Sequence, residues 1–251
     1  MNLNKWITHF ERNRQHRPEP EWDAPVQLSQ SQIARLLPSL KQFQLGDGGG
    51  PASLIANDAW RFREQTEQTR TVVDSWFAEE REHSRLLGRA VARFGGKPIT
   101  GHWSFSAFCL SRRVLGVDFE LTVLLLTEIV STAYYRVLRR HVDDAALKDV
   151  CSLILRDEAG HVAFHRDRLS SDAERSGRAF GTIWRSGFRL LGYAAATMLW
   201  VNHGKCLAPF GATTSEFYRE VRLEFSRFVG RLDRKVQWTP SPSARAVECM
   251  S

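Results

Sequence analysis

The stretch RDEAGHVAFH, residues 156–165, combines two acids and two histidines within one apolar-periodic run. Glu158 and His161 lie three residues apart, close to one turn of an α-helix, so their side chains project from the same face. The segment EEREH, residues 79–83, repeats this Glu-x-x-His spacing with Glu80 and His83. The sequence therefore predicts two helices that each offer a carboxylate and an imidazole to a site.

A third carboxylate, Glu128, lies in the apolar segment LLLTEIVSTAYY, residues 124–135. An isolated ionised carboxylate in such a helix is costly to remove from water, so it needs a proton or a cationic partner. Two metal ions shared with the Glu-x-x-His pairs would supply that partner. Oxygen and imidazole ligands around open coordination positions suit iron or manganese.

Helical periodicity dominates the chain and strands are scarce, so the predicted fold class is all-α. Glycine and proline breaks and capping residues separate the helices, with Asp143 or Asp144 as one N-cap and Gly95-Gly96 as one stop. A long connection is expected over residues 97–112. The predicted helices cover residues 31–65, 69–93, 114–141, 144–169, 179–204 and 214–236.

These segments predict one helical domain over residues 29–237, preceded by a polar arm at 1–28 and followed by a loose tail at 238–251. The bundle would occupy about residues 31–169, a break would fall at 170–177, and two additional helices would occupy about residues 179–236. The run Leu190 to Val201 is too short to span a bilayer, and we interpret it as a core helix.

Four long helices with one long link between the second and third have the layout of a ferritin-like four-helix bundle. On this layout and its motifs, over about residues 31–169, the chain resembles the ferritin-like di-iron carboxylate superfamily, which includes rubrerythrins and di-iron oxygenases. The resemblance implies two iron ions, or manganese or a mixed pair, with O2 as co-substrate. The motif residues that carry it are, in chain order, Glu80, His83, Glu128, Glu158 and His161.

The resemblance also implies a ligand from the first helix, about 33 residues before Glu80, where this chain has Asp47 in FQLGDGGGP. Aspartate is one methylene shorter than glutamate, and Pro51 disturbs a regular helix there. We expect Asp47 to be a metal ligand in a loosened turn. The alternatives are that Asp58 supplies the ligand, or that the ligand is missing.

Two further acids precede the ligand glutamates, and in similar families such acids hold the ligand histidines of the opposite motif. Asp157 would then orient His83, and Glu79 would orient His161; the alternative is that both acids face solvent. The family motif has arginine just before each histidine. This chain has Glu82 and Gly160 at those positions, which makes the match less specific.

Several other side chains have two interpretations each. His165, one turn past His161, is expected to support the site or the core, with a third-histidine ligand as the alternative. Thr132, one turn past Glu128, would lie beside the oxygen-binding side of the metals as a catalytic residue, or bond its own backbone. Four other side chains are expected to pack in the core, namely Tyr134, Tyr135, Trp200 and His203. The alternative for the two tyrosines is a redox role, and the alternative for Trp200 and His203 is to line a substrate pocket.

The composition limits the kinds of molecule that the protein is expected to bind. The 251 residues carry a formal charge of +7 and a pI near 9.6, spread along the chain, and no aromatic–basic RNA motif is visible. The four cysteines fit neither a zinc pattern nor a disulfide framework, and MNLNKWITHF lacks a signal-peptide core. We therefore expect a cytoplasmic protein that acts on a small-molecule substrate and receives electrons from a reductase or ferredoxin. We expect no membrane or nucleic-acid partner, and a homodimer is compatible with the sequence.

The predicted function is a non-haem dinuclear-iron, O2-dependent oxygenase or oxidase that hydroxylates, N-oxygenates or oxidatively rearranges a small organic molecule. One alternative is a rubrerythrin-like peroxidase or iron-handling protein, although rubredoxin-type Cys-x-x-Cys pairs are missing. A second alternative is a non-catalytic helical binding protein. A third is a tRNA-modifying hydroxylase, since one such family shares this bundle and the chain is basic. The substrate, the electron donor and the oligomeric state do not follow from the sequence.

Overall fold

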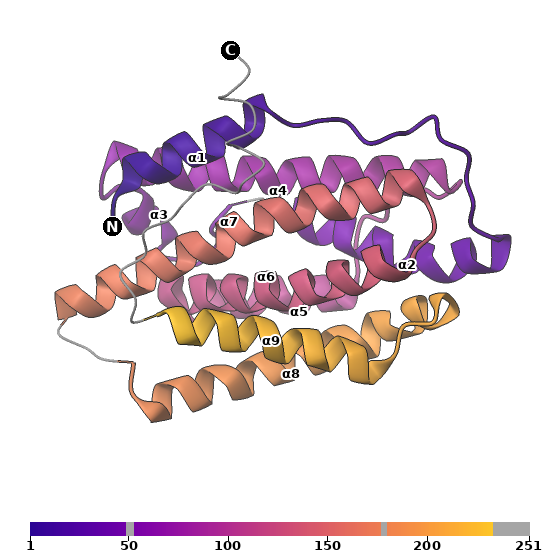
Figure 1. Cartoon of the computed structure of the whole chain (residues 1–251). Helices are drawn as coiled ribbons and strands as arrows, with labels where there is room; N and C mark the ends of the chain where they lie inside the picture. Colours follow the sequence, from indigo (N-terminus) through magenta and orange to yellow (C-terminus); the bar gives the residue numbers. More distant parts are fainter. Residues whose placement is uncertain (49–52, 177–179, 233–251) are drawn as a thin grey trace, which may run out of the picture.

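The computed structural model is all-α over the residues that it describes, 1–48, 53–176 and 180–232 (Figure 1). The predicted helices are present with shifted ends, and three short helices join them. In chain order the helices are α1 Leu3–Gln15, α2 Gln30–Gly48, α3 Ala59–Arg63, α4 Glu67–Arg93, α5 Trp103–Val114, α6 Gly116–His141, α7 Ala145–Ser176, α8 Thr182–Leu207 and α9 Thr214–Arg231, with a 3-10 turn at Ala208–Phe210.

The helices α2, α4, α6 and α7 form the central bundle. Helix α2 packs antiparallel to α4, since Gln44 meets Ser84 while Leu37 meets Gly96. Helix α4 is also antiparallel to α7, which is itself joined to α6 by the tight link 142–144. It follows that α4 and α6 run in the same direction, so the chain must travel back along the bundle between them.

That return is made by residues 94–115, the link that was expected as a plain connection. The structure corrects this expectation because α5, Trp103–Val114, lies within it. Two helix ends match the sequence signals. Gly95, with a φ of 73°, follows the last residue of α4 and its C-cap, and Asp144 caps α7 by accepting a hydrogen bond from the backbone N–H of Leu147 at 3.0 Å.

Residues 1–28 were expected to form a polar arm. That expectation is wrong for the first half of the segment, because α1 is part of the core. Trp6 and Phe10 are almost completely buried, and both rings contact Phe164 of α7, which in turn contacts Trp76 of α4. With Leu3 and Ile7, which pack against the same cluster, they form an apolar stripe on one face of α1. This helical spacing was present in the sequence but was not recognised among the many polar residues of the segment.

Two other boundaries differ from expectation. The predicted helix 31–65 is two helices, since α2 ends at Gly48 and α3 starts at Ala59. The predicted break at 170–177 is also wrong over its described part, because α7 continues to Ser176. Residues 49–52, which include the expected turn at Pro51, and the expected tail at 238–251 lie outside the described residues.

The two C-terminal helices pack on the bundle as expected. Helix α9 covers α6, with Phe217, Val221 and Phe225 buried, and α8 lies between α9 and α2. The stretch Leu190 to Val201, however, is not a core helix. Figure 1 shows α8 along the outer edge of the molecule, and much of that stretch is exposed to solvent.

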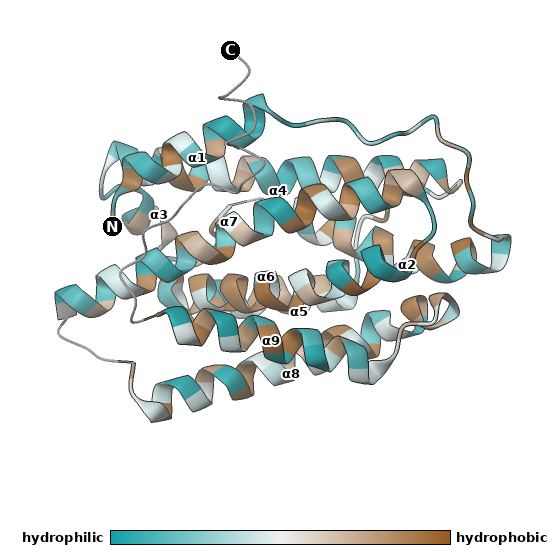
Figure 2. Cartoon of the chain, viewed as in Figure 1, coloured by the Kyte–Doolittle hydropathy of each residue, from teal (hydrophilic) through white to brown (hydrophobic). Residues whose placement is uncertain are grey.

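Helix α6 is mostly hydrophobic in Figure 2 and runs through the centre of the bundle. In the part of the chain that the structure describes, it is the one helix long and apolar enough to cross a membrane. Within its most apolar window, however, 72% of the residues are buried against other helices. That burial matches the central helix of a helical protein.

The apolar core consists of two clusters along the bundle axis. One includes Leu86, Leu125 and Ile154, and the other includes Phe77, Leu124 and Phe164. On α4 and α7 the residues between the two clusters are the predicted metal-binding segments, and Glu128 of α6 lies one turn after the boundary between them. The fold therefore holds a polar layer between two apolar ones.

Candidate metal centre

The structure brings together all six residues that were predicted to bind metal. They come from four helices: Asp47 from α2, Glu80 and His83 from α4, Glu128 from α6, and Glu158 and His161 from α7. They form two groups, in each of which potential ligand atoms lie within 4.8 Å of one another. One group is Glu80, Glu128, Glu158 and His161, and the other is Asp47, Glu80 and His83.

Glu80 and Glu158 each span both imidazoles. Glu80 places Oε1 3.0 Å from His161 Nδ1 and Oε2 3.8 Å from His83 Nδ1. Glu158 places Oε2 3.5 Å from His161 Nδ1 and Oε1 3.9 Å from His83 Nδ1. Two carboxylates arranged in this way can bridge two cations. Asp47, beside His83, and Glu128, beside His161, are then placed to bind one cation each.

Several polar atoms that face this space are buried without a hydrogen-bond partner among the described residues. They are Nδ1 of His83 and of His161, both carboxylate oxygens of Glu128, and Oε2 of Glu158. An unsatisfied buried polar atom is costly, and such atoms are rare in folded proteins. A convergent group of oxygen and nitrogen atoms of this kind fits two divalent cations, which would satisfy all of them at once.

The remaining nitrogen of each histidine is held by an acid on the opposite helix. His83 Nε2 is hydrogen-bonded to Asp157 Oδ2 at 3.1 Å, and His161 Nε2 to Glu79 Oε2 at 2.9 Å. Both acids are buried, so the solvent-facing alternative is wrong. These bonds fix Nε2–H as the donor in the neutral ring and leave Nδ1 of each imidazole free for a metal.

Sequence reasoning missed the partner of these two acids, Arg17. Its Nη2 lies 2.6 Å from Asp157 and 3.8 Å from Glu79, so one guanidinium from the segment after α1 sits between both. Helix α1 also approaches α7 closely at Gly160, where a Cβ would lie 2.4 Å from Nε2 of His9, so a larger residue there would displace the His9 ring. No pattern in the sequence linked Arg17 to these acids.

The first-helix ligand is positioned by a close approach of α2 and α4. A Cβ at Gly48 would lie 2.5 Å from Cβ of Ser84, and the Ser84 hydroxyl donates to the carbonyl of Gln44 at 2.9 Å. This contact puts Asp47 beside Glu80. The alternative ligand Asp58 is wrong, because its carboxylate accepts the backbone N–H of Val117 at 3.0 Å, at the start of α6.

Burial and mutual repulsion set the protonation of the carboxylates. Burial, with a contribution from Glu80, raises the pKa of Glu128 to about 8 and that of Glu158 to about 7. The same two causes raise the pKa of Asp47 well above its usual range. Burial would also raise the pKa of Glu80, but the adjacent imidazoles outweigh it and hold that pKa below its ordinary value.

The two histidines shift the other way. Burial lowers the pKa of a histidine, but hydrogen bonding to Asp157 and the nearby Glu80 raise the pKa of His83 well above its ordinary value. The carboxylates of Glu158, Glu79 and Glu80 do the same for His161. The metal-free site therefore holds protons at neutral pH, and binding of cations would release them.

His165 lies beside Glu128, with Nε2 3.5 Å from Oε2, and its ring meets Trp76 edge-on at 4.9 Å. Its two ring nitrogens are buried and have no hydrogen-bond partner among the described side chains and backbone. Burial lowers the pKa of His165 well below its ordinary value, so it is neutral. It belongs to neither ligand group within the described chain, and its place next to Glu128 fits the supporting role.

Thr132 does not have the position expected of a catalytic residue. Its hydroxyl donates to the backbone carbonyl of Glu128 at 2.7 Å, which was the alternative interpretation. On α6 the adjoining cavity is lined by Leu124, Thr127, Glu128, Val130, Ser131 and Tyr135, and Thr132 is not among its lining residues. The hydroxyls of Thr127 and Ser131 likewise donate to backbone carbonyls, those of Leu124 and Glu128.

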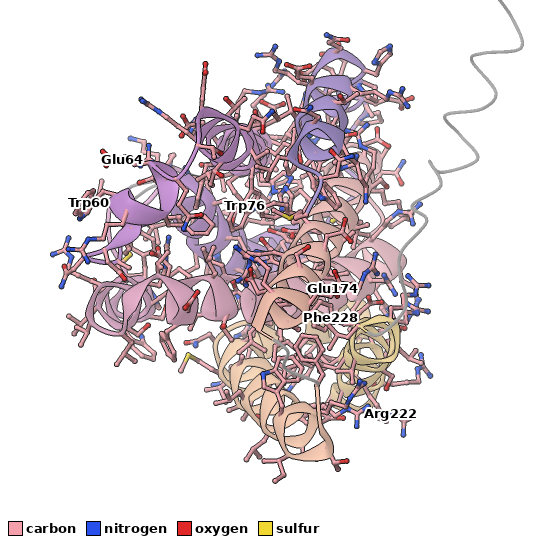
Figure 3. The ribbon with its side chains drawn as sticks, turned by 90° about the vertical axis from the view of Figure 1, so that its left-hand side faces the viewer. Trp60, Glu64, Trp76, Glu174, Arg222 and Phe228 are labelled. Atoms are coloured by element: carbon pink, nitrogen blue, oxygen red, sulfur yellow. The ribbon has the colours of Figure 1, made fainter. Side chains whose placement is uncertain are left out.

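A cavity of about 260 Å³ adjoins the carboxylates. Asp47, Glu80, Glu128 and Glu158 form part of its wall, and helices α2, α4, α5, α6 and α8 supply the rest. Apolar surface makes up the larger part of that wall, but about half of the lining residues are polar or charged, among them Arg112, His102 and His203. Seen along the bundle in Figure 3, one of the lining residues, Trp76, points into the interior, whereas Trp60 and Glu64 lie on the outer side of α3.

The remaining candidates divide between core and cavity. Tyr134 is buried and its hydroxyl is 2.6 Å from Ser39 Oγ, which is 2.8 Å from Nδ1 of His203. His203 and Tyr135 line the cavity, and the Tyr135 hydroxyl has no partner among the described residues. Trp200 stacks on Phe217 at 5.0 Å, as a core residue. Among the described cysteines, 109, 151 and 206 are free thiols, and Cys249 lies outside the described part.

Comparison of the chain with protein-family models, curated protein sequences and solved structures finds no match. The geometry of the site and its cavity is therefore what indicates a function for this chain.

The acid behind His83 is expected to matter for metal binding. Asp157→Asn keeps the shape of the side chain but removes the charge that holds the imidazole, so the affinity for Co2+ or Mn2+ should fall about 10–100-fold. The matched control is Glu82→Gln, an acid on α4 that pairs with Arg85 at the surface. Equal affinities in titrations of both variants would contradict the role assigned to Asp157.

The stability of the metal-free protein should decrease as pH rises from about 6.5 to 8. Folded Glu128, His83 and His161 have a pKa above the unfolded value, so in this window the folded state keeps protons that the unfolded state releases. One such proton corresponds to a slope of at most ~1.4 kcal/mol per pH unit. Urea unfolding of wild type and Glu128→Gln measures it, and the variant should show the smaller slope. A stability that rises with pH in this window would contradict the assigned protonation.

Proposed function

We propose that the chain is a non-haem dinuclear-iron, O2-dependent oxygenase or oxidase of a small organic substrate, built on a ferritin-like bundle. The observation that carries the proposal is the joint presence of two features. Six convergent ligand side chains come from four helices, and a largely apolar cavity of about 260 Å³ adjoins them directly. A cation site with such a cavity suits oxidation of an organic molecule.

The residues divide the work of the site. Asp47 and His83 would hold one ion, Glu128 and His161 the other, and Glu80 and Glu158 both. Iron held in this way supplies the reduction and activation of O2. Asp157 and Glu79 keep the imidazoles oriented, and Arg17 offsets their charge. The aromatic wall excludes water and positions the substrate against the carboxylate face.

Three features of the chain support this proposal over its rivals. Storage or transport of iron needs no aromatic cavity beside the ligands. A rubrerythrin-like peroxidase would usually carry a second iron site on paired cysteines, which the sequence lacks. A non-catalytic binding protein has no need for the buried, unpartnered ligand atoms, which cost stability. Manganese or a mixed pair fits the same ligands, and the electron donor would be a reductase or ferredoxin.

Metal content tests the site itself. The purified protein loaded with ferrous iron under argon should hold two iron ions per chain, because two ligand groups are present. The variants His83→Ala and His161→Ala should each lose iron, since each removes a ligand atom. His203→Ala is the matched control, because His203 lines the cavity but is in neither group, and it should keep its iron. Full iron content in a His83→Ala, His161→Ala double variant would overturn the proposal.

The cavity can be tested separately from the metals. Ala195 lines the cavity and its neighbour Ala194 is exposed on α8. Ala195→Phe should abolish O2 uptake coupled to an organic substrate without changing iron content, whereas Ala194→Phe should alter neither. Peroxide consumption that is unaffected by Ala195→Phe, with no substrate-coupled O2 uptake in wild type, would favour the peroxidase. A salt-sensitive association with tRNA would favour the tRNA hydroxylase.

A further inference from the structure

Exposed apolar side chains gather on two helices that flank the cavity. Fourteen large hydrophobic residues are exposed in the described part of the chain. Four lie on α5 and its C-cap, namely Trp103, Leu110, Val114 and Leu115. Six lie on α8, namely Ile183, Leu190, Leu191, Tyr193, Met198 and Val201. These ten residues are called the α5–α8 surface below.

Their spacing follows the helices. Trp103, Leu110 and Val114 are seven and four residues apart, and Leu190 and Val201 are eleven apart, so each set projects from one side of its helix. Several are highly exposed, with 71% for Leu190 and 69% for Val201. Exposed apolar residues that are scattered singly need no explanation, but gathered ones mark a binding surface.

The charge on the same two helices has one sign. Neither α5 nor α8 contains an aspartate or glutamate, and no acid occurs between Glu82 and Asp118 or between Glu174 and Glu216. The exposed charged residues on the helices are cations: Arg113, Arg189 and Lys205. An apolar face with cations and no acids is complementary to an anionic lipid surface.

A second copy of the chain fits this surface less well. In a symmetric dimer that buried the α5–α8 surface, the cations of one chain would face the same cations of the other chain. Neither helix has an acid that could pair with them. Anionic headgroups would neutralise the same cations. Trp103 and Tyr193 also have the amphipathic rings that favour the membrane–water interface.

The α5–α8 surface meets the cavity at one residue, Met198. Phe105 and Phe108 of α5 and Met198 and Leu199 of α8 line the cavity, and Met198 is also 59% exposed on the outside. We propose that the α5–α8 surface docks the protein on an anionic lipid bilayer, with the cavity reached from that side. This revises the sequence-based expectation of no membrane partner, which rested on interpreting α8 as a core helix.

Docking in this way also indicates the class of substrate, a step that rests on the proposed function. A cavity with an apolar wall that is reached from the bilayer side suits an apolar or amphiphilic molecule that partitions into lipid. The docking itself does not depend on the metal site, so it can be tested with metal-free protein.

The test is co-sedimentation of the full chain with lipid vesicles, carried out on metal-free and metal-loaded protein. One set of vesicles is phosphatidylcholine alone, and the other contains about a third phosphatidylglycerol. Binding should be at least about tenfold stronger to the anionic vesicles and should weaken at high salt. The double variant Leu190→Ser, Val201→Ser should bind about tenfold or more weakly than wild type. The control is Trp60→Ser, Leu223→Ser, which removes exposed apolar residues from α3 and α9 instead. Circular dichroism and thermal melting confirm that both variants fold.

Failure of wild type to bind anionic vesicles would overturn the proposal, as would equal binding by the two double variants. Light scattering adds the remaining outcome. A wild-type dimer that Leu190→Ser, Val201→Ser converts to a monomer, without vesicle binding, would identify the surface as an interface between copies. If vesicle binding is present but iron does not bind, the docking stands and the proposed oxygenase function fails.

Discussion

The structure depends on one electrostatic constraint, the convergence of carboxylates from four helices in the interior of the bundle. Removing so much negative charge from water is costly unless protons, imidazoles or cations compensate for it. The raised pKa values of Glu128, Glu158 and both histidines, which keep protons in the site, are the compensation available to the metal-free chain. Two divalent cations would provide it without protons, and they would give partners to the buried ligand atoms that have none among the described residues.

Further charged side chains surround that layer and hold its residues in place. Glu79 and Asp157 cross between α4 and α7 to hold the imidazoles, and Arg17 holds both acids from the segment after α1. The ring of His9 on α1 occupies the space beside Gly160, so the N-terminal helix packs closely over the site. On the opposite side, α5 and α8 leave a cavity in place of a solid core. The two sides of the bundle thus serve different purposes, charge compensation on one and access on the other.

The sequence was sufficient for the inner layer because helical spacing is local. Glu80 with His83, and Glu158 with His161, must share a face wherever the helices lie, and Glu128 in an apolar segment needs compensation in any fold. Long-range partners had no such signal. Arg17 is one arginine among many, with no pattern that links it to Glu79 or Asp157. Helix α1 did have a signal, since Leu3, Trp6, Ile7 and Phe10 recur at helical spacing, but its partners in the core could not be identified from the sequence. For helix α8 the prediction was wrong in the opposite direction, because a helix expected in the core is largely exposed. An apolar run in a sequence is consistent with a buried helix and with an exposed apolar face alike. Thr132 does lie one turn after Glu128, but it does not line the cavity and its hydroxyl is hydrogen-bonded to its own helix backbone, which spacing alone could not predict.

The most direct measurement is anomalous diffraction at the iron edge from crystals of the protein loaded with ferrous iron under argon. We expect two peaks about 3.5–4 Å apart, the usual separation in dinuclear sites, with Glu80 and Glu158 in contact with both. A crystal with no peak between α2, α4, α6 and α7, or with a single ion bound by other side chains, would contradict it.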